Sequence, residues 1–398
     1  MIKSNDAQPP SKITSLAGKF LKKILKTRIT QGKLSLRLPS GEKIEVSGNH
    51  SGVHALVQVN KLRAFARIWR NGSLGLAEGF MEKDWETDSL ATLLTFFADN
   101  LNTFESLAKG GLLQRVKNAW TQKTNRNSRS GSKKNIAYHY DLGNDFYSLW
   151  LDESMTYSSG IFRETNDLAK AQTKKYERLC EVASLEKTHR VLEIGCGWGG
   201  LLEHLSKNGF QAEGISVSEE QVNFTSRRLM NKDKVSVRFQ DYRDVEGQYD
   251  RIFSVEMFEA VGSQYWDLFA KRISDLLAHD GVAVMQMITI DENIFKSYEK
   301  RTDFIQKYIF PGGMLPTLRH IKEMFSRQGL RITDIYPFGQ DYGQTLKQWQ
   351  DRFTSAWPRI QAQGFDSRFF RQWMYYLCYC EVGFNSGRTD VIQIRLER

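Results

Sequence analysis

The sequence contains few cysteines and prolines and has no long apolar run. Among its 398 residues are seven prolines and four cysteines, namely Cys180, Cys196, Cys378 and Cys380. Their spacing fits neither a zinc site nor a redox CxxC motif, so we expect a reduced protein without a metal. No stretch approaches the roughly 18 to 20 apolar residues that a membrane span requires. A secretory pattern is also missing at the N-terminus, so we expect a cytoplasmic protein that meets any membrane from the side.

The charge balance favours an anionic partner. The chain has 56 Lys and Arg against 46 Asp and Glu, a formal net charge of +10. Such a charge suits either nucleic acid or an anionic lipid surface. The hydrophobic content of 40% is enough for a full core, which excludes disorder throughout.

The first part of the chain predicts a small domain over residues 12–121, after a disordered start at 1–11. Its first element is a basic amphipathic helix, which either packs on its own domain or lies at a membrane interface. A β-hairpin over 33–48 and helices near 58–70 and 86–99 follow. A polar stretch at 122–134 predicts a linker, so we expect the second domain to span 135–398. In the basic helix the apolar positions are Ile13, Leu16, Phe20, Ile24 and Leu25, and the lysines are Lys12, Lys19, Lys22, Lys23 and Lys26.

The second domain alternates apolar strand-like runs with helix-like segments. This alternation predicts an α/β fold with a doubly wound parallel sheet. The predicted strands are Val191–Ile194, Gln211–Ser216, Val235–Phe239, Arg251–Val255 and Gly281–Ile288.

A glycine-rich turn follows the first of these strands. Gly195, Gly197 and Gly199 come directly after Glu193-Ile194, an order that resembles the cofactor loop of methyltransferases more than the phosphate loop of dehydrogenases. The second strand ends in hydroxyl residues rather than the usual ribose-binding acid. Asp241, after the third strand, stands where an adenine-binding acid is expected.

Several motifs follow one another in a specific order. They are Tyr138–Asp145, Met155–Gly160, Gly195–Gly199, Gly214–Gln221, Met257–Gly262, Tyr308–Pro316 and Asp341–Leu346. Together they resemble the cyclopropane-fatty-acyl-phospholipid synthases and the related mycolic acid cyclopropane synthases. The resemblance implies a Rossmann-like class I methyltransferase domain that uses S-adenosylmethionine, with a smaller N-terminal α+β lipid-binding domain. The cofactor contacts that it implies are Tyr157, Ser158, Gly195, Gly197, Ser216, Val217, Gln221 and Tyr242.

The resemblance also implies a reaction. An acyl-chain double bond attacks the methyl group of the cofactor, and a bound bicarbonate removes a proton from the resulting carbocation. The implied bicarbonate ligands Glu259, Ile288 and Tyr342 match the family. Three others differ, since Ser159, Glu256 and Gln286 replace a cysteine, a glycine and a histidine.

We hypothesise that these three changes are coupled, so that the Glu256 carboxylate takes the place and the role of bicarbonate. The alternative is that Glu256 hydrogen-bonds a bicarbonate that is still bound, or forms an ion pair. In either case the carboxyl groups of Glu256 and Glu259 should lie at close range and should have perturbed pKa values.

Other functions stay open from the sequence. The product is a cyclopropane ring, or a methyl or methylene branch, or a methylated conjugated chain. A non-catalytic lipid-binding protein is a further alternative. A nucleic-acid methyltransferase is disfavoured, because neither an Asn-Pro-Pro-Tyr nor a Pro-Cys motif is present, so we expect no nucleic-acid partner.

The expected partners are unsaturated acyl chains and the inner face of a phospholipid membrane, and the resemblance implies a possible homodimer. His139 is interpreted as structural. The aromatic residues of 369–384 either pack a helix or line an acyl-chain pocket.

Overall fold

The structure, a computed structural model, describes residues 19, 21–101, 142–230 and 232–398. The predicted disordered start, the linker and His139 lie outside these residues. Contacts divide the described chain into two units, one with the residues up to 101 and Gly364–Val382, and one with residues 142–363 and Gly383–Arg398. The sequence predicts a single domain over 135–398, whereas Gly364–Val382 contacts the first unit, where Arg371 pairs with Glu86 and Arg368 pairs with Glu82.

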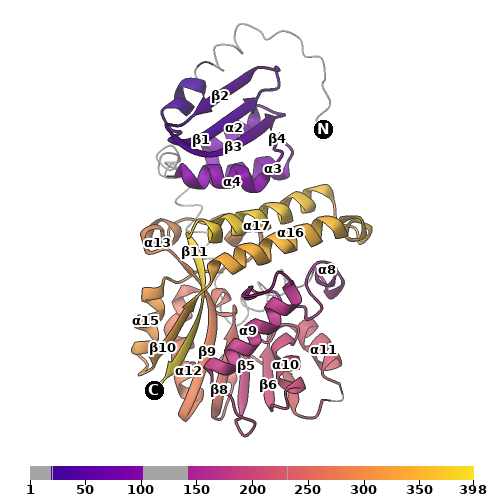
Figure 1. Cartoon of the computed structure of the whole chain (residues 1–398), viewed down its shortest axis with the longest axis vertical. Coiled ribbons are helices and arrows are strands. Elements are labelled where there is room, and N and C mark those ends of the chain that lie inside the picture. The colour runs from indigo at the N-terminus through magenta and orange to yellow at the C-terminus, as the bar shows by residue number, and fades with distance from the viewer. Residues whose placement is uncertain (1–18, 20, 102–141, 231) are drawn as a thin grey trace. The chain divides into compact units, whose positions relative to one another are not determined.

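The first unit is α+β (Figure 1). The predicted hairpin is confirmed, because β1 and β2 pair antiparallel. The helix predicted near 58–70 begins later, because the alternating residues before it form a strand, β3. Of the basic helix, residues 21–26 are described and helical, with Leu25 buried. The strands, in the sheet order β2-β1-β3-β4, are β1 (Gln31–Arg37), β2 (Lys43–Ser47), β3 (His50–Val59) and β4 (Trp85–Glu86), and the helices are α2 (Arg63–Asn71), α3 (Ser73–Met81), α4 (Leu90–Asp99) and most of α17 (Ser367–Asn385).

The second unit is built on a seven-stranded sheet with the order β10-β11-β9-β8-β5-β6-β7, which confirms the doubly wound α/β fold. The strands from β9 to β7 run parallel, as predicted. The sequence analysis missed β10 and β11, which form an antiparallel edge. The strands are β5 (Val191–Ile194), β6 (Ala212–Ser216), β7 (Val235–Phe239), β8 (Tyr249–Val255), β9 (Leu277–Ile290), β10 (Arg331–Pro337) and β11 (Thr389–Glu397).

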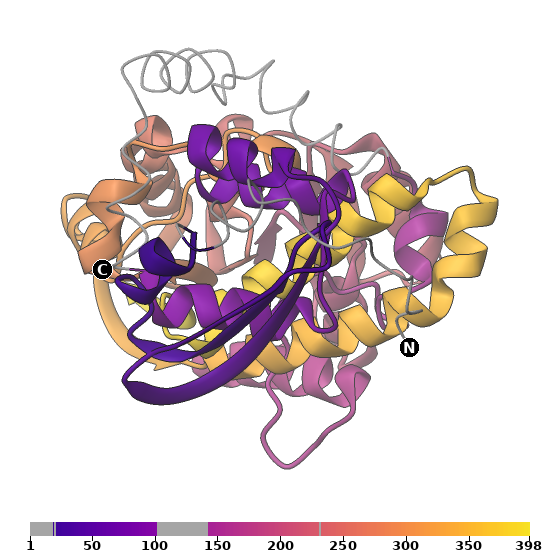
Figure 2. The same ribbon diagram turned by 90° about the horizontal axis from the view of Figure 1, so that it is seen from above.

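Helices cover both faces of this sheet, and two cores result. Neighbouring residues of β8 show the division, since Ile252 faces the core under α12 and α15, while Phe253 faces the core under α9 and α10. The long helix α16 is visible in both views (Figures 1 and 2). None of the described helices is long and apolar enough to cross a bilayer. The helices are α8 (Asn144–Ser148), α9 (Leu168–Val182), α10 (Gly200–Lys207), α11 (Glu219–Arg228), α12 (Trp266–Leu276), α13 (Glu292–Tyr298), α14 (Phe304–Tyr308), α15 (Leu318–Ser326) and α16 (Gly339–Ala362).

Candidate active site

The glycine loop at the carboxyl end of β5 has room for a ligand on one side. Gly195 and Gly197 have φ values of 79° and 53°, a region that glycine enters without steric cost. A Cβ atom at Gly195 would lie 2.5 Å from Cγ of Met257, whereas one at Gly197 would meet no described atom within 4 Å. The loop is therefore closed against Met257 and open at Gly197, as a cradle for a cofactor requires.

The neighbouring strand β6 places three predicted cofactor residues beside this loop. Ser216 ends β6, Val217 follows it, and Gln221 lies in the first turn of α11. The hydroxyl of Ser216 donates to Oε1 of Gln221 at 2.9 Å, and both side chains are buried. The end of β6 thus carries a hydroxyl group, paired with an amide of α11, where a carboxylate is usual.

Asp241 and Tyr242 follow the edge strand β7. The Asp241 carboxylate accepts hydrogen bonds from Nε and Nη2 of Arg243 at 2.8 and 2.6 Å, so its charge is already paired. Burial raises the pKa of Tyr242 to about 12, and its ring packs edge-on against Phe269. Adenine recognition by Asp241 stays a prediction, and its carboxylate would have to bind adenine while held by Arg243.

Tyr157 and Ser158 lie on a loop that α9 holds from behind. Gln172 donates to the Ser158 carbonyl at 2.9 Å, and Nζ of Lys175 donates to Oγ of Ser158 at 2.7 Å. When Lys175 carries its proton, its ammonium group has no lone pair, so the Ser158 hydroxyl accepts from Lys175 and keeps its own proton for another acceptor. In that state Ser158 presents an O–H donor that is polarised by a buried cation.

Lys175 is a site residue that the sequence analysis missed. Its side chain is 0% exposed and forms no ion pair with a described carboxylate. Burial lowers the pKa of Lys175 to about 7, an effect that Glu256, Asp152 and Glu193 oppose. Oε2 of Glu193 is itself buried and has no partner among the described residues, and burial raises the pKa of Glu193 to about 8. Polar groups so poorly paired in the interior are typical of a functional site.

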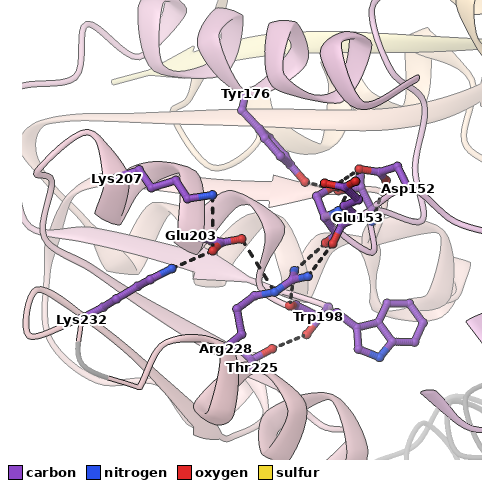
Figure 3. A network of polar contacts seen from close by, with 12 residues as sticks. Asp152, Glu153, Tyr176, Trp198, Glu203, Lys207, Thr225, Arg228 and Lys232 are labelled. Carbon is purple, nitrogen blue, oxygen red and sulfur yellow. Dashed lines mark hydrogen bonds and ion pairs between the residues drawn. The ribbon is translucent and has the colours of Figure 1, made fainter. Parts of the chain in front are cut away.

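Arg228 of α11 joins two loops of the site (Figure 3). Its Nη1 donates to the carbonyls of Ser154 and Trp198 at 2.6 and 3.0 Å, and its Nη2 donates to the Glu153 carbonyl at 2.8 Å. Nε lies 3.8 Å from Glu203. The guanidinium thus connects the loop before Tyr157 to the glycine loop.

We expect Arg228→Lys to weaken cofactor binding about tenfold, because lysine keeps the charge but cannot span three carbonyls, and a hydrogen bond to a charged group contributes about 1.5 kcal/mol or more. Isothermal titration with S-adenosylhomocysteine measures this. Arg227→Lys, one residue earlier and exposed, is the matched control. Equal affinities in the two variants would show that cofactor binding does not need the hydrogen bonds from Arg228 to the three carbonyl groups.

Glu256 follows β8 and receives three hydrogen bonds. Oε1 accepts from the backbone N–H of Ser159 at 3.0 Å and from Nε2 of Gln286 at 2.7 Å, and Oε2 accepts from the Tyr342 hydroxyl at 2.6 Å. These donors come from a loop, from β9 and from α16. Burial raises the pKa of Glu256, while the three hydrogen bonds and Lys175 favour its ionised form. The three residues that depart from the family pattern are therefore in direct contact.

The backbone of Glu256 is strained. Its φ of 49° lies in the left-handed region, where a residue with a Cβ atom loses roughly 1–2 kcal/mol relative to the right-handed region. Glycine, the residue that the family resemblance implies here, has no such cost. Retention of a strained carboxylate is typical of a residue with a function.

A chain of side chains fixes the direction of these hydrogen bonds. Nη1 of Arg178 donates to Oε1 of Gln393 at 2.9 Å, and Nε2 of Gln393 donates to Oε1 of Gln286 at 3.0 Å. Since arginine only donates, each amide in turn must accept on its oxygen and donate through its nitrogen. Gln286 is thereby set to donate to Glu256, which favours a carboxylate that accepts.

Glu259 lies close to Glu256 and behaves differently. Its Oε1 accepts from the backbone N–H of Ile288 at 2.6 Å, while its Oε2 is buried and has no partner among the described residues. Burial and the nearby Glu256 raise the pKa of Glu259 to about 8. At neutral pH Glu259 is therefore largely protonated, whereas the three hydrogen bonds to Glu256 favour its carboxylate form against the effect of burial.

Aromatic rings surround the same region. The Tyr157 ring lies 5.3 Å from Trp349, 5.6 Å from Trp150 and 6.4 Å from Phe310, between ring centroids. Tyr342 meets Trp349 edge-on at 6.1 Å. Aromatic faces stabilise a nearby cation and exclude water.

Comparison with protein families supplies the deciding observation. A family model described as mycolic acid cyclopropane synthetase matches residues 127–394, well over half of the chain. The chain belongs to the mycolic acid cyclopropane synthetase family. As a member of this family it is an S-adenosylmethionine-dependent methyltransferase that acts on lipid acyl chains.

The names of individual relatives of this methyltransferase agree with the family assignment. The tuberculostearic acid methyltransferase of Mycobacterium tuberculosis is 36% identical over 83% of this chain and 80% of its own. The cyclopropane-fatty-acyl-phospholipid synthase of Escherichia coli K12 is 34% identical over 86% of this chain and 87% of its own. A crystal structure of a mycolic acid cyclopropane synthase in complex with SAH and CTAB covers 67% of this chain and 98% of its own, with a TM-score of 0.63 and 27% identity.

The site of this methyltransferase fits S-adenosylmethionine. Gly197 leaves open space, the Ser158 hydroxyl has a proton to donate, and Glu193 has a buried oxygen without a partner. A ligand with a carboxylate and an amine would satisfy these groups, since the carboxylate can accept from Ser158 and the amine can donate to Glu193. Ser216 and Gln221 supply further polar atoms next to the open side of the loop.

We expect Glu259→Gln to change how the stability of the methyltransferase depends on pH. The folded pKa of about 8 lies above the ordinary 4.5, so between these values the folded state binds more protons than the unfolded state, and stability falls as pH rises. Glutamine cannot ionise, yet its oxygen still accepts from Ile288. The variant should therefore match the wild type near pH 5 and melt several degrees higher at pH 9. Thermal unfolding at pH 5, 7 and 9 measures this, with exposed Glu181→Gln as control, and parallel curves at all three would contradict it.

Proposed function

We propose that this methyltransferase adds a methylene group to a double bond in an acyl chain of a membrane phospholipid and closes a cyclopropane ring, with Glu256 as the base. The observation that supports this proposal is the Glu256 carboxylate, held by Ser159, Gln286 and Tyr342. When bound, S-adenosylmethionine supplies the methyl group that the double bond takes up, which leaves a carbocation on the acyl chain.

Glu256 then accepts a proton from the added methyl group, and the electron pair of that C–H bond closes the ring on the cationic carbon. The base must be ionised, and the three donors on its oxygens favour the ionised form. The same three donors are the groups that would hold a bicarbonate ion, and all of them already point at Glu256. We therefore propose that Glu256 makes bicarbonate unnecessary.

The surroundings of the base support cation chemistry. Tyr342, which donates to Glu256, meets Trp349 edge-on, and Trp349 in turn contacts Tyr157. The largely protonated Glu259 adds little negative charge that would draw water in. A carbocation survives only where water is excluded and electron-rich faces are near.

A second candidate is a methyl or methylene branch at the former double bond. A carboxylate with hydrogen bonds on both oxygens is a weaker base than a free one. Slower proton removal gives time for a hydride to move to the cationic carbon, after which loss of a proton leaves a methylene branch. The similarity to the tuberculostearic acid methyltransferase supports this candidate as well.

The test is incubation of the purified chain with methyl-labelled S-adenosylmethionine and vesicles of anionic phospholipid that carry monounsaturated chains. The fatty acid methyl esters are then analysed by mass spectrometry and proton NMR. Cyclopropane proton signals establish the first product, and signals of an exomethylene group, or of a methyl group on a retained double bond, establish the second. Absence of label from the lipid would refute both.

A further inference from the structure

Helix α2 of the first unit exposes an apolar stripe to solvent. Leu62, at its N-cap, is 57% exposed and Trp69 is 84% exposed. With the exposed Ala66 between them, they follow the i, i+4, i+7 spacing of one helix face. The opposite face buries Ala64. The helix is therefore anchored on one side and apolar on the other.

This exposure is unusual within the part of the chain that the structure describes. Trp69 is the most exposed of the large hydrophobic residues there, and Met230, at 68%, is the next. Removal of an indole ring from water is favourable, so a solvent-facing tryptophan beside an exposed leucine indicates a surface that another apolar phase covers.

Cations border the stripe. The segment from Lys61 to Asn71 contains four basic residues and no acidic one. Arg70 is exposed, and the side chain of Lys61, which lies 3.9 Å from Asp84, is still about half exposed, at 53%. An exposed tryptophan with lysine and arginine beside it matches the composition of helices that lie at anionic membrane interfaces.

The helix is also held rigidly for such a role. The buried Asp84, just before β4, pairs with Nε of Arg63 at 2.8 Å and with Nε of Arg67 at 2.9 Å. These two ion pairs fix α2 to the sheet of its own unit. A stripe on a fixed helix loses little conformational entropy when it docks.

We propose that α2 docks on an anionic phospholipid membrane, with Leu62, Ala66 and Trp69 at the boundary of the acyl chains and with Lys61 and Arg70 at the headgroups. This inference rests on the proposed function, because it supplies the surface by which the enzyme reaches acyl chains in a bilayer. The occupant is a lipid surface rather than a second copy of the chain, since a second copy would bring like charges together.

The experiment compares the full-length wild type with Trp69→Ser, Arg70→Glu and the control Met230→Ser, which removes an exposed apolar side chain from the other unit. Co-sedimentation with vesicles of phosphatidylglycerol and phosphatidylcholine gives the affinities. We expect Trp69→Ser to bind about tenfold more weakly, Arg70→Glu about fivefold more weakly at low salt only, and Met230→Ser like the wild type. Brominated lipids should quench tryptophan fluorescence less in Trp69→Phe than in the wild type.

Methyl transfer to the same lipid dispersed in detergent separates docking from catalysis, and all variants should retain it. Wild-type binding by Trp69→Ser would overturn the proposal, as would a wild type that methylates dispersed lipid without binding vesicles. A change of sedimentation coefficient in Trp69→Ser would assign the stripe to self-association instead and would also overturn it. Failure of every protein to methylate dispersed lipid would refute the proposed function, and vesicle binding would still decide the role of α2.

Discussion

Glu256→Gln should lower turnover at least about a hundredfold, the range in which a general base contributes, while cofactor affinity stays within about twofold. The amide is nearly the same size, its oxygen can still accept from Ser159 and Gln286, and its NH2 group can donate to the Tyr342 hydroxyl, so the fold of the site should persist. It cannot accept a proton from the carbocation. Single-turnover measurement of label transfer to lipid, together with titration of S-adenosylhomocysteine, separates the chemical step from binding.

A second substitution at the same position tests the replacement of bicarbonate. Glu256→Gly removes the carboxylate and suits the backbone φ of 49°. It leaves space next to the donors of Ser159, Gln286 and Tyr342, which an added bicarbonate ion can fill. We expect bicarbonate to restore part of the activity of Glu256→Gly and none of that of Glu256→Gln, whose amide still occupies the space. Normal turnover in Glu256→Gln, or stimulation of the wild type by bicarbonate, would refute the role of Glu256.

Lys175→Met should weaken S-adenosylmethionine binding roughly tenfold to a hundredfold and at the same time raise the melting temperature. The loss of affinity follows from the hydrogen bond to Ser158, since bonds to charged groups contribute about 1.5–3 kcal/mol. The gain in stability follows because the lysine is 0% exposed without an ion pair to a described carboxylate, and methionine of similar length has no charge to desolvate. A stability gain with a loss of function is typical of site residues.

Differential scanning calorimetry and equilibrium titration measure the two effects. Lys174→Met, the same substitution one residue earlier on the partly exposed side of α9, is the matched control and should change neither quantity much. A merely structural Lys175 would give the opposite result, with a lower melting temperature and unchanged affinity.

The sequence predicted the parts of the site that belong to short local motifs. The glycine loop, the ends of β6 and β7 and the position of Glu256 all follow from local patterns, because parallel strands bring their carboxyl ends to one edge of the sheet. The hypothesis that the changes at Ser159, Glu256 and Gln286 are coupled agrees with the hydrogen bonds that Glu256 receives from the other two residues. Its catalytic role stays a prediction.

The missed residues depend on long-range packing. Lys175 looks like one of two adjacent helix lysines, and only its place among the buried positions Ala171, Tyr176 and Leu179 could have indicated a buried charge. Gln393 lies on β11, whose antiparallel pairing with β9 no local pattern revealed. Arg228 contacts backbone carbonyl groups, which every residue has, so the sequence could not indicate its partners.

The chain of hydrogen bonds that ends at Glu256 begins near the protein surface. Arg178 forms its ion pair with Asp334, whose side chain is 40% exposed, so water and dissolved ions reach the outer end of a series whose inner end is the proposed base. The proton affinity of that base is therefore open to adjustment from outside the pocket. Substitutions at Asp334 or Arg178 could tune the competition between ring closure and branching while every atom that touches the lipid stays in place.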